Sequence, residues 1–390
     1  MAQAPDALEK TASIMPEESI PPAAGPEPKL RGPAGIKDIA QALGLSIGTV
    51  DRALHARPGI NAMTRARVLS MAQTLGYRPN VAARFLKLKR KLRIAIHLPR
   101  EIAAFFDVLT EGIREAAGPF LSTVELEFRT HRRLGEGDVD LIRQALEEQA
   151  NGIILAPGHP DDLKPWIRKA ARRQIPVVCV ATDAPKTERL TAIAADPYTG
   201  GAIVAELFLR TVPKPGPVIM VTGDLNTYDH AEKLRGFKEF LGTNKHLLLR
   251  EVIQAHDDPG EAYQSVSDAL AKAGDIRAVY ASTANSMPVI RALEEAGRLG
   301  DVCIMTTDLF PELIPLIRSG KVLGTVYQRP HTQGRMAFQA LYQFLVEGKC
   351  PPARMRLAPH IILQSNLNLF LESQPIDAGE RGTCRDSEFL

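Results

Sequence analysis

The sequence lacks the features that mark membrane, secreted and metal-binding proteins. No window reaches the roughly 18 consecutive apolar residues of a membrane span, so we expect no membrane association. The N-terminus has no basic segment followed by an apolar one, as a secretory signal would. The four cysteines form no CxxC pair and no metal-ligand spacing with histidine. These absences favour a cytoplasmic protein with reduced thiols and without a bound metal or cofactor.

Acidic residues are nearly absent from one segment. Between Lys29 and Arg100 the chain carries 15 Lys and Arg residues but only two acids, Asp38 and Asp51. That segment has a net charge of +13, whereas the whole chain has +3, so the remaining residues sum to −10. Such separation is typical of a polyanion-binding module attached to a neutral or acidic body. On charge alone a solvated basic face is the favoured explanation, and the helix pattern beneath the charge reverses that preference.

Common catalytic motifs are also missing. The sequence contains no GxGxxG, P-loop, GxSxG or HExxH motif. We therefore expect no enzymatic activity. An α/β enzyme with aspartates as catalysts stays open as an alternative, which turnover of a candidate sugar would reveal.

The segment after a Pro- and Ala-rich N-terminal tail has the pattern of three short helices. Gly44 ends the first helix, Ser46 is a suitable N-cap for the second, and Asn61 is one for the third. Apolar residues at helical spacing define the expected inner faces: Ile36, Ile39, Ala40, Leu43, Val50, Leu54, Val68, Leu69, Ala72 and Leu75. Two helices joined by a tight turn and braced by a third indicate a helix-turn-helix, whose second helix enters the major groove of DNA.

From residue 93 onward, short apolar strands alternate with amphipathic helices. The expected strands are 93–99, 124–129, 152–156, 176–180, 190–194, 217–222, 247–253, 278–281, 302–306 and 322–326. Alternation of this kind implies parallel sheets with right-handed crossovers, and the segment is too long for one sheet. The fold class expected is thus an all-α helix-turn-helix head followed by a two-lobe α/β body.

These patterns divide the chain into an ordered series of segments. The expected boundaries are 1–33 for a disordered tail, 34–78 for the head, 79–92 for a hinge helix and basic linker, 93–372 for the body, and 373–390 for a loose tail. Within the body we expect an N-lobe of residues 93–192 and 324–354, and a C-lobe of residues 193–323 and 355–372.

The run IKDIAQALGLSIGTVDRALHARPGINAMTRARVLSMAQTLGYRPNVAARFLK closely resembles the DNA-binding domain of the lactose-repressor (LacI) family of bacterial transcription regulators. The resemblance implies that Arg52 reads a base, a role that suits a side chain able to donate two hydrogen bonds to guanine. Asp51 departs from the small hydroxyl residue common there and either accepts from cytosine or pairs with Arg52 or Arg57. The DNA contacts expected are Ser46, Ile47, Gly48, Thr49, Asp51, Arg52, His55, Asn80, Ala83, Leu86 and Lys87.

Residues 79–86 resemble the hinge helix of the same family. A helix this short is unstable in isolation, and Leu86 is an apolar wedge of the kind that enters a minor-groove step. The resemblance implies that the helix forms when a dimer sits on its operator, with an ordinary linker helix as the alternative. The following residues, from Lys87 to Arg93, are more basic than is usual in the family, so we expect a steeper salt dependence of DNA binding.

Several runs in the body resemble the type I fold of periplasmic sugar receptors, as used in this repressor family. They are RIAIHLPREIAAFFDVLTEGIREAA, IPVVCVATD, AADPYTGGAIVAELFL, TTDLF and GTVYQRP. Sites in such folds lie beyond the carboxyl ends of the strands, between the lobes. The resemblance implies effector contacts at Phe105, Phe106, Asp183, Lys233, Asn285, Asp308 and Gln328.

Each of these residues also has a purely structural explanation. The aromatic pair can belong to the core, Asp183 and Asp308 can cap helices, and Asp196 is expected to cap the helix that begins near Thr199. The sequence also departs from the family. Lys233 stands where Arg is common, and Ala103 and Ala156 stand where polar ligands are expected.

The sequence therefore predicts a homodimeric, cytoplasmic regulator of transcription, more often a repressor than an activator. Its expected partners are a near-palindromic double-stranded DNA operator and a small-molecule effector, a sugar, polyol or derivative. A periplasmic transport receptor stays open as a further alternative, which a gel shift on genomic DNA would distinguish.

Overall fold

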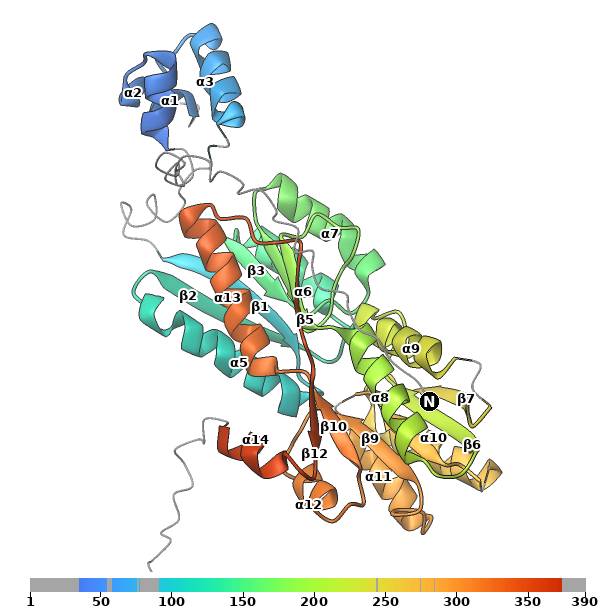
Figure 1. The fold of residues 1–390 in the computed structure, drawn as a ribbon. Helices are drawn as coiled ribbons and strands as arrows, with labels where there is room; N and C mark the ends of the chain where they lie inside the picture. Colours follow the sequence, from blue (N-terminus) through green and yellow to red (C-terminus); the bar gives the residue numbers. More distant parts are fainter. Residues whose placement is uncertain are drawn as a thin grey trace, which may run out of the picture. The chain divides into compact units, whose positions relative to one another are not determined.

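A computed structural model describes residues 35–54, 58–75, 77, 91–242, 245–273, 275–283 and 285–373. The chain forms two compact units, Met1–Arg78 and Pro79–Leu390 (Figure 1). Among the described residues, no helix is both long and apolar enough to cross a membrane.

The first unit is a bundle of three helices, α1 (Ile36–Leu43), α2 (Ile47–Leu54) and α3 (Ala62–Thr74). Its core consists of small and β-branched residues from all three helices: Ile39, Ala40, Val50, Ala53, Val68 and Ala72. Leu69 and Leu75 were expected to face this core, but they are 48% and 37% exposed. Val68 and Ala72, four residues apart, define the inner stripe of α3, and Leu69 lies about 100° around the helix from Val68.

The helix ends of this unit follow the expected capping. Gly44 ends α1 in the left-handed conformation at φ 65°, which glycine adopts without steric cost. The Ser46 hydroxyl accepts from the Thr49 amide at 3.1 Å, and Asn61 Oδ1 accepts from the Thr64 amide at 2.7 Å. These caps fix where α2 and α3 begin.

The second unit contains two six-stranded sheets, each between layers of helices. The first sheet has the order β11-β5-β4-β3-β1-β2, and each of its strand pairs is parallel. Its strands are β1 (Leu92–Pro99), β2 (Val124–His131), β3 (Gly152–Leu155), β4 (Val177–Val180), β5 (Thr191–Ala195) and β11 (Arg354–Leu357). Helices α5 (Ala103–Ala117) and α13 (Pro330–Glu347) cover one face, and α6 (Asp138–Glu147) and α7 (Pro160–Arg172) cover the other. A short 3-10 helix, Gly118–Phe120, follows α5. This sheet and its helices form the N-lobe.

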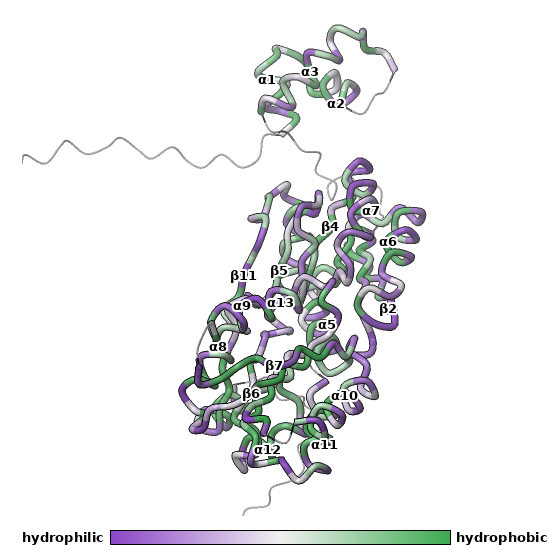
Figure 2. The backbone as a smooth tube through the Cα atoms, turned by 90° about the vertical axis from the view of Figure 1, so that its right-hand side faces the viewer, coloured by the Kyte–Doolittle hydropathy of each residue, from purple (hydrophilic) through white to green (hydrophobic). Residues whose placement is uncertain are grey.

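The second sheet has the order β12-β10-β9-β8-β6-β7, with β12 antiparallel to β10. Its strands are β6 (Gly216–Thr222), β7 (Leu247–Gln254), β8 (Ala278–Ala281), β9 (Cys303–Thr307), β10 (Gly324–Tyr327) and β12 (His360–Leu363). Helices α8 (Pro197–Thr211) and α9 (Tyr228–Leu241) cover one face. Helices α10 (Pro259–Lys272), α11 (Ser286–Glu295), α12 (Leu313–Arg318) and α14 (Leu367–Ser373) lie toward the other. This sheet and its helices form the C-lobe, and Figure 2 shows hydrophobic residues running through its strands.

The chain passes between the lobes three times, after β5, after β10 and after β11. The expected boundaries placed residues 324–354 in the N-lobe, but β10 pairs with β9 and β12 and so belongs to the C-lobe. Likewise β11 pairs with β5 in the N-lobe, whereas residues from 355 onward were expected in the C-lobe. The sheet to which a short strand belongs is known only from the strands with which it pairs, and the sequence pattern does not show these pairings.

Glycines allow two helix pairs to pack backbone against backbone. In the N-lobe, a Cβ on Gly334 would lie 2.0 Å from the Leu109 carbonyl oxygen, so α13 packs directly on α5. In the C-lobe, a Cβ on Gly201 of α8 would lie 2.0 Å from the carbonyl oxygen of Lys233 on α9. This close approach fixes the position of the α9 backbone and hence of Lys233.

Candidate functional site

Helix α2 presents polar residues, a glycine and one large apolar residue at the surface of the first unit. Ser46, Ile47 and Gly48 are exposed at its start, and Ile47 is 51% exposed. The Arg52 side chain lies along the same helix, and its Nε donates to the Gly48 carbonyl oxygen at 3.1 Å. The hydroxyls of Ser46 and Thr49 lie 2.8 Å apart. The described residues that were expected to contact DNA therefore lie on α2 or at its N-cap: Ser46, Ile47, Gly48, Thr49, Asp51 and Arg52.

Asp51 is half-buried, and its charge acts on Tyr77, which follows α3. Burial, with a smaller contribution from Asp51, raises the pKa of the Tyr77 hydroxyl. His55, Asn80, Ala83, Leu86 and Lys87, which were expected to contact DNA, lie outside the described residues, and so does Arg57.

In the second unit, the loops at the carboxyl ends of the two sheets meet. The Asp229 amide at the start of α9 donates to Thr182 Oγ1 after β4 at 3.3 Å. His159 Nε2, after β3, lies 2.8 Å from Asp224 Oδ2, after β6. These contacts place the strand ends of the two lobes face to face, where ligands bind in open α/β sheets.

Asp183 follows β4 and is bound by two arginines. The Arg189 guanidinium donates to both carboxylate oxygens, with Nη2 2.8 Å from Oδ2. Arg354 of β11 places its Nε 2.9 Å from the same Oδ2, and its guanidinium also lies over the Tyr228 ring at 5.4 Å. Asp183 is therefore a buried carboxylate at the centre of an ion-pair cluster.

Lys233 is buried on α9. Its Nζ lies 2.7 Å from Asp229 Oδ2 and donates to the Ser282 carbonyl oxygen at 3.2 Å. Burial favours the neutral amine, but the charge of Asp229 and the hydrogen bond to it, together with the charges of Tyr280 and Asp308, outweigh burial and raise the pKa of Lys233. The side chain therefore carries its charge in the interior, next to the carboxyl ends of β6 and β8.

Asp308, which is buried, and Gln328, which is half-buried, form a second pair. The Gln328 amide donates to Asp308 Oδ1 at 2.9 Å, and Gln328 Nε2 donates to Oδ2 at 2.7 Å. Burial raises the pKa of Asp308 to about 6. Gln333 Nε2 donates to the Gln328 carbonyl oxygen at 2.7 Å, and Gln333 Oε1 accepts from the Ala181 amide at 3.1 Å. This chain of bonds connects the C-lobe pair to the end of β4 in the N-lobe.

The other expected effector contacts have different surroundings. Asn285 donates through Nδ2 to the Asp257 carbonyl oxygen. Phe105 and Phe106 are buried in the N-lobe core with their rings edge to face, 5.0 Å between centroids. Asp196 caps α8, accepting from the Thr199 amide at 2.9 Å, as expected.

The structure adds polar residues that the sequence analysis did not select. Thr222 ends β6, Ser282 follows β8, and Asp257 lies three residues beyond β7. They are buried, and each has a side-chain oxygen without a hydrogen-bond partner in the described part of the chain. All three lie at the end of a strand or shortly after it, and this position is the sequence signal that could have identified them. The described residues contain no group of three or more His, Cys, Asp or Glu side chains suited to a metal ion.

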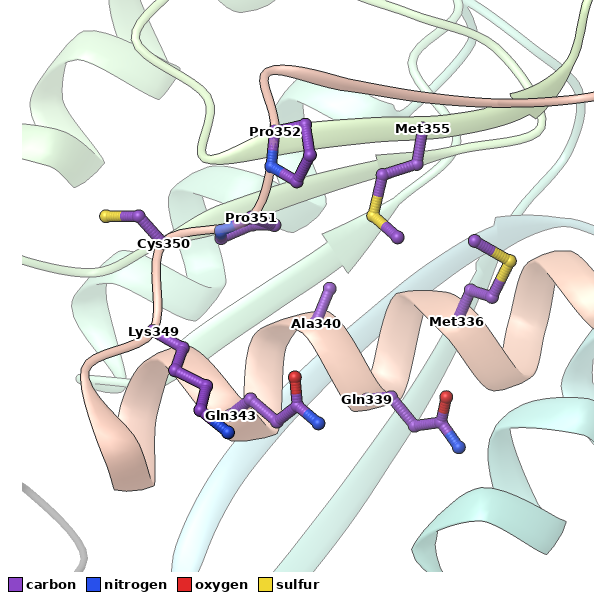
Figure 3. Close-up of a pocket in the computed structure, with 9 residues that line it drawn as sticks. All are labelled: Met336, Gln339, Ala340, Gln343, Lys349, Cys350, Pro351, Pro352 and Met355. Atoms are coloured by element: carbon purple, nitrogen blue, oxygen red, sulfur yellow. The ribbon is translucent and has the colours of Figure 1, made fainter. Parts of the chain in front are cut away.

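A separate pocket of about 480 Å³ lies in the N-lobe between α13 and the segment that leads into β11 (Figure 3). Its lining is Met336, Gln339, Ala340, Gln343, Lys349, Cys350, Pro351, Pro352 and Met355. None of the expected effector contacts belongs to this lining, so it is distinct from the facing strand ends.

A helix-turn-helix head joined to a two-lobe α/β body with facing polar strand ends defines the class of ligand-responsive DNA-binding regulators. Residues 35–80 match the family model described as bacterial regulatory proteins, lacI family, and residues 94–349 match the periplasmic binding protein domain. The chain belongs to the lacI family of transcriptional regulators, and its body is a periplasmic-binding-protein domain.

Known proteins resemble the chain at the level of whole domains. The ribose operon repressor of Bacillus subtilis is 26% identical over 325 residues, which are 79% of this chain and 90% of that protein. The catabolite control protein A of Priestia megaterium is 25% identical over 217 residues, which are 55% of this chain and 63% of that protein. A solute-binding protein from Burkholderia graminis, solved with D-arabinose, has a TM-score of 0.66 at 21% identity and covers 71% of this chain and 97% of its own. This last likeness concerns the fold.

Proposed function

We propose that the protein is a homodimeric transcriptional repressor whose affinity for a near-palindromic operator is set by a small carbohydrate-like effector. The observation that carries the proposal is the pair of polar strand ends that face each other across the lobes, with buried side-chain atoms that have no hydrogen-bond partner among the described residues. A protein that binds operator DNA works in the cytoplasm. Residues 34–78 serve as the head, 79–92 as hinge and linker, and the lobes as the effector and dimerisation domain.

In this proposal α2 lies in the major groove. The exposure of Ile47 and Gly48 and the position of Arg52 along the same helix support it. Arg52 contacts a guanine, and Ser46 and Thr49 contact the backbone or a base edge. The hinge residues around Leu86 meet those of the second protomer at the centre of the operator, which sets the spacing of the half-sites.

The effector lies between the carboxyl ends of the two sheets. Asp308, Gln328 and Asn285 supply polar contacts from the C-lobe, and Lys233 holds its neighbouring carboxylate in place. Asp183 supplies an N-lobe contact or orients Arg354 toward the site. Bonds such as Asp229 to Thr182 form across the lobes, so their making and breaking accompanies lobe movement.

The effector changes operator affinity through that movement. A ligand shifts a conformational equilibrium only by its difference in affinity for the two states, and typical couplings are about 1–3 kcal/mol. Whether bound effector releases or strengthens DNA binding follows from which lobe arrangement the operator-bound dimer requires.

Operator selection from fragmented genomic DNA, followed by fluorescence anisotropy, tests the DNA-binding part of the proposal. We expect one or a few near-palindromic duplexes to bind at least about 1,000-fold more tightly than scrambled duplexes, in the range typical of specific sites. Equal affinity for selected and scrambled duplexes would refute it. A thermal-shift screen with sugars and polyols then tests effector binding, because a ligand of the native state raises the melting temperature.

A further inference from the structure

We infer that the effector is a polyhydroxylated molecule without an anionic group, and that Asp257 and His230 select it. This inference rests on the proposed effector site between the lobes and specifies its chemistry. It starts from a buried row of four polar side chains in the C-lobe, of which the family resemblance assigned only Lys233.

The row runs Asp257, His230, Asp229, Lys233. His230 Nε2 lies 3.6 Å from Asp257 Oδ2, and His230 Nδ1 lies 3.9 Å from Asp229 Oδ2, so both separations exceed a hydrogen bond. Lys233 Nζ closes the row at 2.7 Å from the same Asp229 oxygen. All four residues are buried, and Asp257 is 3% exposed.

Residues in the row or next to it form hydrogen bonds with the N-lobe. Asp229 begins α9, and its amide donates to Thr182 of the N-lobe. On the other side, the carbonyl oxygen of His256, next to Asp257, accepts from Arg133 Nη1 at 3.3 Å, and Arg133 follows β2 of the N-lobe. The row therefore lies between two contacts that join the lobes.

Hydrogen-bonding capacity around the row is unused. In the described part of the chain, these buried atoms have no hydrogen-bond partner: Thr222 Oγ1, Thr227 Oγ1, Asp229 Oδ1, both ring nitrogens of His230, Asp257 Oδ1, Ser282 Oγ and Ser286 Oγ. A buried polar atom without a partner is costly, and native proteins leave few of them. Two are carboxylate oxygens, which only accept, and the hydroxyls both donate and accept. A ligand with many hydroxyl groups offers both functions at close spacing.

The charges of the row oppose an anion. Asp229 and Asp257 of the row supply two carboxyl groups and the neighbouring Asp308 a third, and Lys233 supplies one ammonium group that Asp229 already neutralises. On the N-lobe side, Arg189 and Arg354 share the single carboxylate of Asp183, which neutralises one of their two charges, and Arg133 binds Glu136 at 2.7 Å. At the row, a phosphate or carboxylate would meet carboxylate oxygens that have no partner in the described part of the chain, and like charges brought together in a poorly solvated site repel strongly.

A matched ligand panel tests the inference by isothermal titration calorimetry on the full chain. One arm contains neutral aldoses, alditols and cyclitols, and the other contains their phosphate esters and uronic acids. We expect binding in the neutral arm, with each anionic counterpart at least about 100-fold weaker. An anionic compound that binds as tightly as its neutral parent would overturn the inference, and so would a panel in which no neutral compound binds.

One variant with a matched control tests the role assigned to Asp257. Asp257→Asn keeps the shape of the side chain and removes its charge. The affinity for the neutral ligand should therefore fall by about 10- to 100-fold, as expected for loss of a charge-assisted hydrogen bond. It should also shrink the preference for the neutral ligand over its phosphate ester, which a merely structural role would leave unchanged. Asp268→Asn, at an exposed position on α10, is the matched control and should change neither value.

The failure of this inference is distinguishable from that of the proposed function. If anionic compounds bind and also alter operator affinity, effector control holds and only the assigned chemistry is wrong. If no compound in either arm binds while the operator is still recognised, both this inference and the proposed effector control fail, and DNA binding alone stands.

Discussion

Replacing Lys233 by methionine tests whether its ammonium group permits the burial of carboxylates in the C-lobe. Methionine preserves much of the apolar stem but cannot pair with Asp229, whose oxygen lies 2.7 Å from Nζ, or donate to the Ser282 carbonyl oxygen. Removal of one member of a buried ion pair typically costs about 3–5 kcal/mol, because the other charge stays buried without a partner. At about 2 °C per kcal/mol for a unit of this size, the melting temperature should fall by about 6–10 °C.

Calorimetry and urea unfolding of the wild type, Lys233→Met and the double variant with Asp229→Asn measure this effect. Because the double variant leaves no unpaired charge, it should be more stable than Lys233→Met alone, with a coupling of about 2 kcal/mol. Arg210→Met breaks the exposed pair with Glu206 and serves as the control, with no measurable loss expected. A loss below about 1 kcal/mol in Lys233→Met, or a double variant destabilised by the sum of both changes, would refute the reasoning.

Three further predictions concern separate parts of the molecule. Arg52→Ala should cost about 1–3 kcal/mol of discrimination at one base pair without changing effector affinity, measured by anisotropy on operator variants. Neutralising Lys87, Lys89 and Lys91 should flatten the salt dependence of operator binding by about one unit of slope for each phosphate that these lysines neutralise, and an unchanged slope would contradict it. Burial raises the pKa of Asp308 from 3.8 to about 6, so the folded state holds this proton more tightly than the unfolded chain does. As the pH rises from 3.8 to about 6, ionisation of Asp308 should progressively lower the free energy of unfolding, by about 3 kcal/mol in all. Unfolding of Asp308→Asn measured as a function of pH should lack this loss.

The alternation of strands and helices was predictable because buried parallel strands are short continuous apolar runs. All ten expected strands exist, with ends shifted by a few residues. The two missed strands, β11 and β12, are four residues each and half-exposed, and β11 contains Arg354 and Arg356. Such edge strands carry little apolar signal, and their sheet is decided by partners far away in the sequence.

The candidate site was predictable in part for the same reason. Asp308 and Gln328 could be selected because each follows a strand, and the structure joins them directly. The arginines on Asp183 could not be foreseen, since Arg354 belongs to an unpredicted strand. The nearness of Asp257 to His230 depends on the order of β6, β7 and β8 in the sheet, which the sequence pattern leaves open.

The arrangement of polar groups explains how binding of an effector would favour the conformation in which the two lobes meet. Interlobe contacts such as His159 to Asp224 hold the strand ends together, and hydrogen bonds from the Asn226 amide and His159 lower the pKa of Asp224 although burial opposes this. These contacts stabilise apposed lobes without a ligand, while buried C-lobe atoms that have no hydrogen-bond partner among the described residues destabilise the same arrangement. A ligand that satisfies those groups only when the lobes meet gains its affinity from the apposed state alone. The difference in affinity that regulation requires then arises from the unsatisfied groups themselves.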